Sequence, residues 1–391
     1  MKLYDTAKQE IVEFVPNPTV LMYTCGITPY DATHLGHAFT FISYDVLQRR
    51  LIDKGHQVKC VRNVTDVDDP LFAKARELGV HYLDLAAGEE ARFESDMTAL
   101  NALPVHSTPR ASSAIPDIRG FIGMVIDRGF AYESGGSVYF NVEKFPQFGS
   151  VSHYSRETMI ALARERGGNV DDPHKRNPLD FVLWHPSASD EPSWDTMWGA
   201  GRPGWHIECT AIALRNLPKA SSTSITLQAG GNDLMFPHHY MTALQARALT
   251  GVEFASCYCH AGMIGLDGEK MSKSRGNLVF VSKLRQEGVS PALIRIALFS
   301  GRYCADRMWS RELVEDAGKI LARLLSALSR QEVAPTFEVV QEIVNAISDD
   351  LNTPKVFDLL NTWCLKSEEG EVGGSPGEIS RALDTYLGIT L

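Results

Sequence analysis

Two short segments of the sequence combine residue types that bind phosphates and metals. Residues 23–37 carry a single cysteine, Cys25, which is followed by a glycine loop and by His34-Leu-Gly-His37. Apolar residues predict a buried strand over 18–23, and apolar residues at helical spacing predict a helix over 38–52. Because the first turn of a helix offers free N–H groups and a positive dipole end, this order predicts a nucleotide-phosphate site. Cys25 would place a soft metal ligand close to that site.

The segment Lys270-Met-Ser-Lys273-Ser predicts a polar loop that carries cations. Two lysines on a loop beside a nucleotide can neutralise the charge of departing pyrophosphate. Taken singly, each motif has a plain structural alternative: His34 and His37 would cap a helix, and the lysines would lie on a solvated turn. Found together in one chain, the two motifs resemble the paired signature of class I aminoacyl-tRNA synthetases and their relatives.

Three residues are candidates for a metal site. Cys25, Cys209 and His238 are each expected at a loop or helix start on the same edge of the fold. A catalytic zinc site takes three protein ligands and keeps one position open. Two thiolates and an imidazole would make the Zn²⁺ site neutral, and a substrate thiolate would then bind as the fourth ligand. Such a site would select cysteine over serine by bonding. For each cysteine alone, a small buried core residue is the alternative.

Two other groups of potential ligands have simpler explanations. The pair Cys257-x-Cys259 lacks the usual spacing of zinc ligands, so we expect both cysteines to lie in a core strand. Asp66, Asp68 and Asp69 would bind Mg²⁺ or cap a turn, and we favour the structural role.

The order of the predicted elements indicates the fold class. The first strand and helix are followed by a second strand over 56–65, and this β-α-β run implies a parallel sheet with a right-handed crossover. Functional residues of such sheets lie at the carboxyl ends of the strands, which places 25–28 and 63–69 at one edge. We predict an α/β fold with a Rossmann-like parallel sheet of the class I nucleotide-binding type, an inserted α+β subdomain and a C-terminal helical domain.

The sequence pattern divides the chain into segments. Residues 1–107 would form the first half of the Rossmann catalytic domain, and residues 201–284 the second half with the lysine loop. Residues 108–200 contain a Ser-Gly-Gly hairpin signal and a Gly- and Pro-rich stretch, and would form the inserted subdomain. Residues 285–391 predict helices and would form the C-terminal domain.

Composition limits the classes of partner. The chain has 391 residues and a formal charge of −10, which disfavours a broad nucleic-acid-binding face. Its hydrophobic content of 44% suits a packed core, and we see no stretch as long as a membrane span. Seven scattered cysteines and the lack of an apolar leader favour a reducing cytoplasm. We expect a monomer.

Several motifs together resemble the cysteinyl-tRNA synthetase group. They are Cys25-Gly-Ile-Thr-Pro-Tyr-Asp-Ala-Thr-His-Leu-Gly-His, Asn63-Val-Thr-Asp-Val-Asp-Asp, Gly204-Trp-His-Ile-Glu-Cys, Asp233-Leu-Met-Phe-Pro-His-His and Lys270-Met-Ser-Lys-Ser-Arg-Gly-Asn. Within the group, the chain is most similar to the cysteine ligases of mycothiol biosynthesis. Those enzymes join L-cysteine to 1D-myo-inositol 2-amino-2-deoxy-α-D-glucopyranoside, called glucosaminyl-inositol below.

Three features favour the ligase branch, and several residues depart from the pattern of the family. The first motif has Gly-Ile-Thr-Pro-Tyr where the synthetases have Gly-Pro-Thr-Val-Tyr, Glu165-Arg-Gly-Gly resembles a ligase motif, and the chain leaves little room for an anticodon-binding module. Thr242 stands where the synthetases carry a glutamate near zinc, which fits a three-ligand site. Asn232 and the pair Asn169-Val170 also depart from the family pattern.

The resemblance implies roles for individual residues. Cys25, Cys209 and His238 would bind the metal. His34, His37, Lys270 and Lys273 would handle the phosphates as catalytic residues. Asp233 would pair with the ammonium of the substrate. The residues around cysteine and its adenylate would be Cys25, Gly26, Ile27, Thr28, Thr40, Asn63, Val64, Thr65, Trp205, Gly231, Asn232, Asp233 and Ile264.

The implied enzyme is a two-step ligase that uses one Zn²⁺ per chain and ATP with Mg²⁺. The carboxylate of L-cysteine attacks the α-phosphate of ATP, and the amine of glucosaminyl-inositol then attacks the acyl carbon of cysteinyl-AMP. Neither tRNA nor a membrane is expected as a partner. The alternatives are a short cysteinyl-tRNA synthetase, which shares the first step, and a non-catalytic zinc- and nucleotide-binding sensor.

Overall fold

The computed structural model describes residues 1–391 except 32, 146–147, 150–152, 218–221 and 272–275. At its centre lies a parallel sheet with the strand order β10-β9-β3-β4. The strands are β3 (Thr19–Ile27), β4 (Gln57–Val64), β9 (Ile225–Gly231) and β10 (Ala255–Ala261). Such a sheet agrees with the predicted α/β fold, because parallel neighbours need long crossover connections.

Helices pack on both faces of the central sheet. One face is covered by α1 (Leu35–Asp53), and the other by α6 (Trp205–Asn216) and α7 (Tyr240–Thr250). Helices α2 (Asp69–Leu78) and α3 (Tyr82–Ala99) follow β4 along the chain. The short turns η3 (Asn232–Leu234) and η4 (Met235–His239) connect β9 to α7. A hairpin of β1 (Lys2–Asp5) and β2 (Glu10–Glu13) precedes the sheet.

Successive residues of β3 pack into different hydrophobic clusters. Val20 and Met22 lie in the cluster that contains α1, whereas Leu21, Tyr23 and Cys25 lie in the cluster that contains α6 and α7. Side chains of a strand alternate between the two faces of a sheet, so this division follows from the sequence of β3. Cys25 therefore faces α6 and α7.

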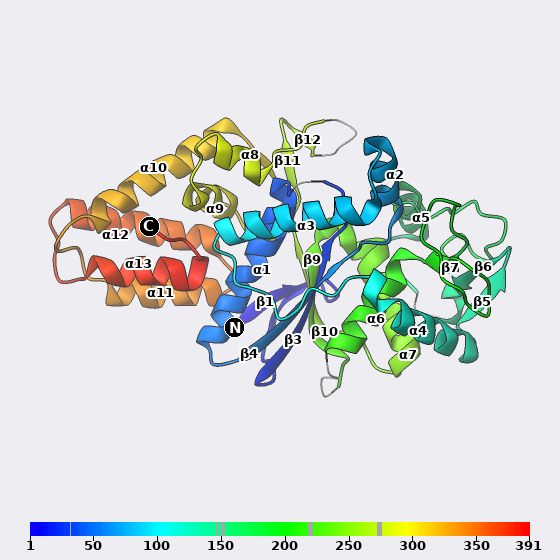
Figure 1. The fold of residues 1–391 in the computed structure, drawn as a ribbon. Helices are drawn as coiled ribbons and strands as arrows, with labels where there is room; N and C mark the ends of the chain where they lie inside the picture. The colour runs from blue at the N-terminus through cyan, green and yellow to red at the C-terminus, as the bar shows by residue number, and fades with distance from the viewer. Residues whose placement is uncertain (32, 146–147, 150–152, 218–221, 272–275) are drawn as a thin grey trace.

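An antiparallel sheet with the order β5-β6-β7-β8 lies at one end of the molecule (Figure 1). Its parts are η1 (Ser112–Ala114), α4 (Ile115–Asp127), β5 (Ala131–Ser134), β6 (Ser137–Phe140), η2 (Val142–Lys144), α5 (Arg156–Glu165), β7 (Phe181–His185) and β8 (Arg202–Pro203). The turn between β5 and β6 has positive φ at Gly135 and Gly136, as the hairpin signal predicted.

A group of helices forms the opposite end (Figure 1). The chain reaches it through β11 (Ile264–Leu266), β12 (Glu269–Lys270), α8 (Val281–Gln286), α9 (Pro291–Phe299) and β13 (Arg307–Trp309). The group itself holds α10 (Arg311–Leu328), α11 (Phe337–Ser348), α12 (Thr353–Glu368) and α13 (Pro376–Leu387). The domain boundaries after residues 107, 200 and 284 stay predictions.

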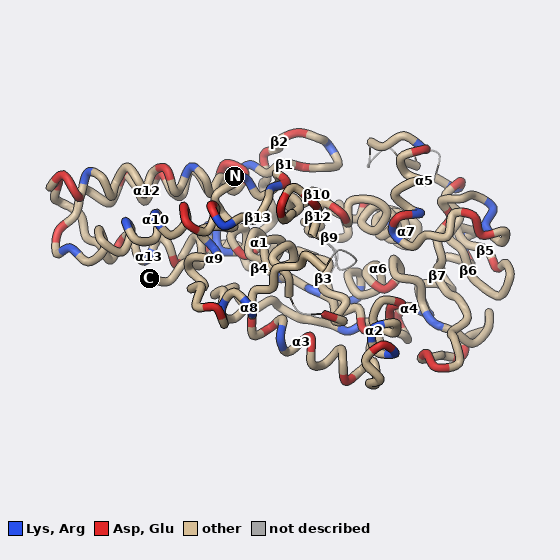
Figure 2. The backbone as a smooth tube through the Cα atoms, turned by 90° about the horizontal axis from the view of Figure 1, so that it is seen from above, with Lys and Arg blue, Asp and Glu red and all other residues tan. Residues whose placement is uncertain are grey.

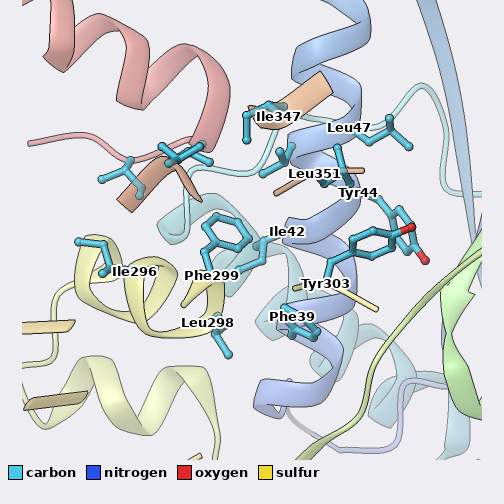
Figure 3. Packing of buried hydrophobic residues seen from close by; sticks show 14 of the residues in the cluster. Phe39, Ile42, Tyr44, Leu47, Ile296, Leu298, Phe299, Tyr303, Ile347 and Leu351 are labelled. Carbon is cyan, nitrogen blue, oxygen red and sulfur yellow. The ribbon is translucent and has the colours of Figure 1, made fainter. Parts of the chain in front are cut away.

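Helix α1 joins the catalytic sheet to the C-terminal helices. Figure 3 shows Phe39 and Ile42 of α1 next to Phe299 of α9, with Ile347 and Leu351 close by. All five side chains are buried in one hydrophobic cluster. Helix α1 therefore has an apolar partner on more than one side, which explains why nearly its whole length is buried.

The outer helices carry both signs of charge. Blue and red segments alternate along α10 and α12 in Figure 2, and Lys319 pairs with Asp316 at 2.7 Å on the surface of α10. Within the described residues, no helix has both the length and the apolar character needed to cross a membrane.

A buried ion pair also fastens α1 to α9. The guanidinium of Arg295, 1% exposed, donates through Nη2 to Oδ2 of Asp45 at 2.6 Å and through Nη1 to the carbonyl oxygen of Leu100. Arg49 also donates to Asp45, at 3.0 Å. Removing one partner of such a cluster leaves uncompensated buried charge.

Replacement of Asp45 should therefore be strongly destabilising. We expect Asp45→Ala to lower the free energy of unfolding by about 3–5 kcal/mol, since Arg49 and Arg295 would remain buried without their shared carboxylate. Urea denaturation followed by circular dichroism measures this loss. The matched control, Asp316→Ala in the exposed pair with Lys319, should cost less than about 1 kcal/mol. Equal losses in the two variants would contradict the structural role of Asp45.

Candidate active site

The carboxyl ends of β3 and β4 carry many of the residues predicted to surround the adenylate. The backbone N–H of Gly26 donates to Oδ1 of Asn63 at 2.9 Å, and Nδ2 of Asn63 donates to the hydroxyl of Thr65 at 2.9 Å. The N–H of Thr65 donates to the carbonyl oxygen of Ile27. A Cβ atom at position 26 would fall 1.6 Å from the carbonyl oxygen of Asn63, so only glycine fits there. Val64 is the last residue of β4.

The end of β9 brings the other predicted adenylate residues to the same edge. A Cβ atom on Gly231 would lie 2.6 Å from Oδ1 of Asp233 and 3.7 Å from Oγ1 of Thr40, which places these residues together. Asn232 begins η3 next to them, and Ile264 is buried in β11. These residues come from different elements, as expected where strands of a parallel sheet end.

Cys25, Cys209 and His238 meet beside this edge. The two sulfur atoms are 4.0 Å apart, and Nε2 of His238 lies 3.2 Å from Sγ of Cys209. Their ligand atoms all lie within 4.8 Å of one another, and all three residues are buried. Thiolates bound to one tetrahedral zinc at about 2.3 Å are about 3.8 Å apart. The donor types and spacing of this triad therefore fit Zn²⁺.

Three different elements supply the triad. Cys25 comes from the face of β3 that looks towards α6, Cys209 lies in α6, and His238 lies in η4 immediately before α7. Trp205, at the start of α6, stacks on the ring of His238 with a centroid distance of 4.0 Å. The stacked indole fixes the plane of the imidazole, so the predicted pocket residue Trp205 is also part of the support of the triad.

Several supporting residues were not predicted from the sequence. His206 and His238 approach through their Nδ1 atoms at 2.9 Å, and His239 places Nε2 3.1 Å from Sγ of Cys25. Nδ1 of His239 is in turn 2.7 Å from Nε2 of His260. Metal-binding histidines commonly bond a second group through their other nitrogen. The only hint of these residues in the sequence was that His206 directly follows Trp205 and that His239 directly follows His238, two residues predicted to lie in the site.

A chain of contacts holds the second histidine pair in place. Nδ1 of His260 lies 2.7 Å from the hydroxyl of Thr6, which donates to the carbonyl oxygen of Tyr258. Burial lowers the pKa of His260 to about 3, so its ring is neutral at physiological pH. Two neutral imidazoles therefore support the Cys25 side of the triad, with Gln228 donating to the same sulfur at 3.6 Å.

The two thiols differ in electrostatic environment. Burial raises the pKa of Cys25 well above its usual value. The hydrogen bond from Cys25 holds the pKa of Cys209 well below its usual value, and His238 and Tyr23 act in the same direction. Cys209 is thus prepared as a thiolate, the form that binds metals.

The two histidines of the first motif lie at the start of α1. Nδ1 of His34 accepts from the backbone N–H of Gly36 at 3.1 Å and from that of His37 at 3.4 Å, so His34 caps the helix. The two rings stack with centroids 3.8 Å apart. Because Nδ1 accepts, Nε2 of His34 carries the proton in the neutral ring. The capping role and the predicted phosphate role are therefore compatible.

The lysine motif is described only in part. Lys270 ends β12, which pairs with β11, and Met271 is buried. Lys273 lies outside the described residues. The residues after the motif return to the first one, because the N–H of Val281 donates to the carbonyl oxygen of Thr33 at 3.1 Å. The two sequence motifs thus approach one another in space.

The acidic segment and the cysteine pair have the structural roles that we favoured. Asp66 accepts from the backbone N–H of Ser112 at 2.8 Å, and Asp68 caps α2 by accepting from the N–H of Asp69. Cys257 and Cys259 are buried in the core cluster on the α1 face of the sheet, away from the triad.

The Glu165-Arg-Gly-Gly segment holds the turns between β9 and α7 in place. The guanidinium of Arg166 donates to the carbonyl oxygens of Asp233 and Phe236. These carbonyls lie in η3 and η4, the turns that carry Asp233 and His238. The segment at the end of α5 therefore supports the loop that carries the predicted pocket residue Asp233 and the candidate metal ligand His238.

Comparisons with known proteins first define the class. Residues 11–319 match the family profile described as tRNA synthetases class I (C) catalytic domain. The fold is similar to methionyl-tRNA synthetase of Mycobacterium tuberculosis in complex with methionyl-adenylate, with a TM-score of 0.62 and 15% identity over 94% of this chain and 88% of that one. It is also similar to LeuRS of Agrobacterium radiobacter in a ternary complex with tRNA and LeuAMS, with a TM-score of 0.65 and 12% identity over 95% and 84% of the two chains. The predicted fold class is confirmed.

Curated relatives narrow the class to one family. The enzyme named L-cysteine:1D-myo-inositol 2-amino-2-deoxy-α-D-glucopyranoside ligase is 49% identical in Streptomyces coelicolor, over 100% of this chain and 96% of the relative. The enzyme of the same name from Mycolicibacterium smegmatis is 44% identical over the same shares of the two chains. The chain belongs to this ligase family within the class I synthetases.

The triad makes a direct prediction about metal content. Cys209→Ser should remove the bound metal, since it replaces the thiolate that the site stabilises best by a hydroxyl that binds zinc poorly. Zinc measured by mass spectrometry of the purified protein should fall from about one atom per chain to below about 0.1. Cys257→Ser, in the hydrophobic cluster on the opposite face of the sheet from the triad, should retain the metal. Full zinc in the Cys209 variant would contradict the ligand assignment.

Proposed function

We propose that this chain joins L-cysteine to glucosaminyl-inositol in an ATP-dependent reaction that releases AMP and pyrophosphate. The proposal rests on one observation: over its whole length the chain is 44–49% identical in sequence to relatives that are named as this ligase. The buried set of two thiols and an imidazole beside the nucleotide edge adds support, because it suits a substrate with a thiol group.

In the first step, the carboxylate of cysteine attacks the α-phosphate of ATP, and cysteinyl-AMP and pyrophosphate form. Gly26 lets β3 approach the backbone of Asn63 closely, and Thr40 and Asp233 lie beside Gly231 at the adjoining end of β9, so these residues would surround the adenylate. His34 would donate through Nε2 to a phosphate oxygen from the helix start, where N–H groups and the dipole favour anions. His37, Lys270 and Lys273 would neutralise the charge of the leaving pyrophosphate, with Mg²⁺ bound to the nucleotide.

The triad would recognise the cysteine side chain. Cys25, Cys209 and His238 would hold one Zn²⁺ per chain, which when bound supplies a soft Lewis-acidic position for the substrate sulfur. His206, His239 and Gln228 fix the orientation of these ligands. Thr28 and Trp205 would enclose the rest of the amino acid, and the Asp233 carboxylate would pair with its ammonium group.

In the second step, the amine of glucosaminyl-inositol attacks the acyl carbon of cysteinyl-AMP, an amide forms and AMP leaves. Adenylation supplies the leaving group, so no enzyme nucleophile is needed. We further propose that the enzyme acts as a monomer in the cytoplasm and does not use tRNA. Cysteines that are free throughout the structure support a reducing compartment.

Two assays test this function in sequence. Purified protein should catalyse cysteine-dependent ATP–pyrophosphate exchange. The exchange rate at equal substrate concentration should be about 10⁴-fold lower with serine, because serine lacks the thiol group that the site would bind. Addition of glucosaminyl-inositol, but not of tRNA, should accelerate AMP release. Acceleration by tRNA would identify a cysteinyl-tRNA synthetase instead. Absence of exchange would exclude both enzymes and leave the nucleotide-binding sensor.

A further inference from the structure

One acidic side chain at the edge of the site has an oxygen that its capping role does not use. Asp68 accepts from the N–H of Asp69 through Oδ1, which completes the cap of α2. Its other oxygen, Oδ2, lies 3.4 Å from the hydroxyl of Thr28, a residue predicted to line the cysteine pocket. Asp68 as a whole is half-buried, so part of the residue is reachable from solvent.

A second acidic residue, Glu208, lies near Asp68 on this side of the site. Glu208 is fully buried, and among the described residues neither of its side-chain oxygens has a hydrogen-bond partner. Burial raises the pKa of Glu208 well above its usual value, and Asp68 adds to the rise, so Glu208 is held as the neutral acid and Asp68 carries the negative charge. Arg202, the cation that acts on Asp68, is itself paired with Asp69 and Glu191. An additional cation would therefore be favoured beside Asp68.

The proposed reaction brings a cation to this side of the pocket. An acceptor amine is mostly an ammonium group at neutral pH, and it must lose a proton before nitrogen can attack the acyl carbon. The carboxyl carbon of bound cysteine lies in the pocket that Thr28 is predicted to line. A base at that place must touch the pocket and also be reachable from solvent. Asp68 meets both conditions.

We propose that Asp68 binds the ammonium group of the acceptor and removes its proton in the second step. The proton passes from nitrogen to Oδ2 and later to solvent. The nitrogen lone pair forms the new C–N bond, and the C–O bond to the phosphate of AMP breaks. The second proton of the attacking nitrogen passes to the departing phosphate oxygen, so that AMP leaves as the monoanion and the amide keeps one N–H. This assignment rests on the proposed function, since it needs an amine acceptor.

The electrostatic surroundings suit a base that works near neutral pH. Burial raises the pKa of Asp68 to about 6, and the Asp69 carboxylate adds to the rise, whereas Arg202 opposes it. Glu208 and Tyr30 are the other titratable groups that face Asp68. Below pH 6 the carboxyl group is protonated and can neither bind ammonium nor accept a proton. The transfer step should therefore weaken as the pH falls through about 6.

The test separates the two half-reactions. Cysteinyl-AMP is formed on the full-length enzyme from ATP and cysteine, the complex is mixed with glucosaminyl-inositol, and AMP release is followed in a single turnover between pH 5.5 and 9. The variant is Asp68→Asn, because asparagine caps a helix as well as aspartate does. Asp69→Asn removes the same charge one residue further along and serves as the matched control.

For Asp68→Asn we expect normal cysteine-dependent pyrophosphate exchange but transfer about a hundredfold slower at pH 7. Its transfer rate should rise tenfold per pH unit up to the pKa of the acceptor amine, because only free amine then reacts. The wild-type rate should already be near its plateau above pH 6. Asp69→Asn should retain transfer. The fall of its transfer rate at acidic pH should begin at a lower pH than in the wild type, because Asp69 no longer raises the pKa of Asp68.

Three results would overturn the assignment or its basis in distinguishable ways. Unchanged transfer in Asp68→Asn would exclude Asp68 as the base. Exchange and transfer falling together would show that Asp68 acts through Thr28 on the adenylate, and Asp68→Ser, which also caps α2, would check that the loss is not one of folding. Exchange without any transfer to glucosaminyl-inositol in the wild type would refute the proposed acceptor itself.

Discussion

The convergence of two thiols and an imidazole behind the end of β3 is the constraint on which the rest of the site depends. Their ligand atoms lie within 4.8 Å of one another, yet they come from β3, α6 and η4. Buried thiols and imidazoles this close need either protons or a metal to satisfy them. The family to which the chain belongs handles cysteine, and a soft ligand set suits that substrate.

The alternation of side chains along β3 brings Cys25 to the face of the sheet on which Cys209 and His238 lie. Tyr23 and Cys25 face α6 because Val20 and Met22 face α1, and the same alternation places the hydrophobic clusters on the two faces of the sheet. A shift of β3 by one residue would exchange these faces and move Cys25 away from Cys209. The packing of α1 and the position of Cys25, the candidate metal ligand on β3, are thus two results of one strand register.

The sequence contained the main elements of the site but few of their supports. The sheet and the meeting of Cys25, Cys209 and His238 followed from strand order and from motifs that resemble a known family. The histidine chain from His239 through His260 to Thr6 could not be predicted, because it joins side chains that are distant in sequence and depends on their final packing. The ion pair of Asp45 with Arg295 could not be predicted either, because the two residues are far apart in sequence and meet only when α1 packs against α9.

In two places, a single side chain can serve both as a helix cap and as a functional group. His34 caps α1 through one ring nitrogen, so the other nitrogen is held as a donor at the same helix start. Asp68 likewise caps α2 through one oxygen while the second faces Thr28. In both cases the cap fixes the side chain, and this fixed orientation is what a group that handles phosphates or protons needs.

In the proposed function, the triad recognises cysteine by a bond between its bound zinc and the sulfur of the substrate. Zinc K-edge X-ray absorption on the metal-loaded protein, recorded with and without substrate, tests this directly. The number of sulfur ligands should rise by one when L-cysteine is added and stay unchanged with L-serine, since Cys25 and Cys209 would supply the others. An unchanged sulfur count with cysteine bound, under conditions where pyrophosphate exchange proceeds, would contradict recognition through the sulfur.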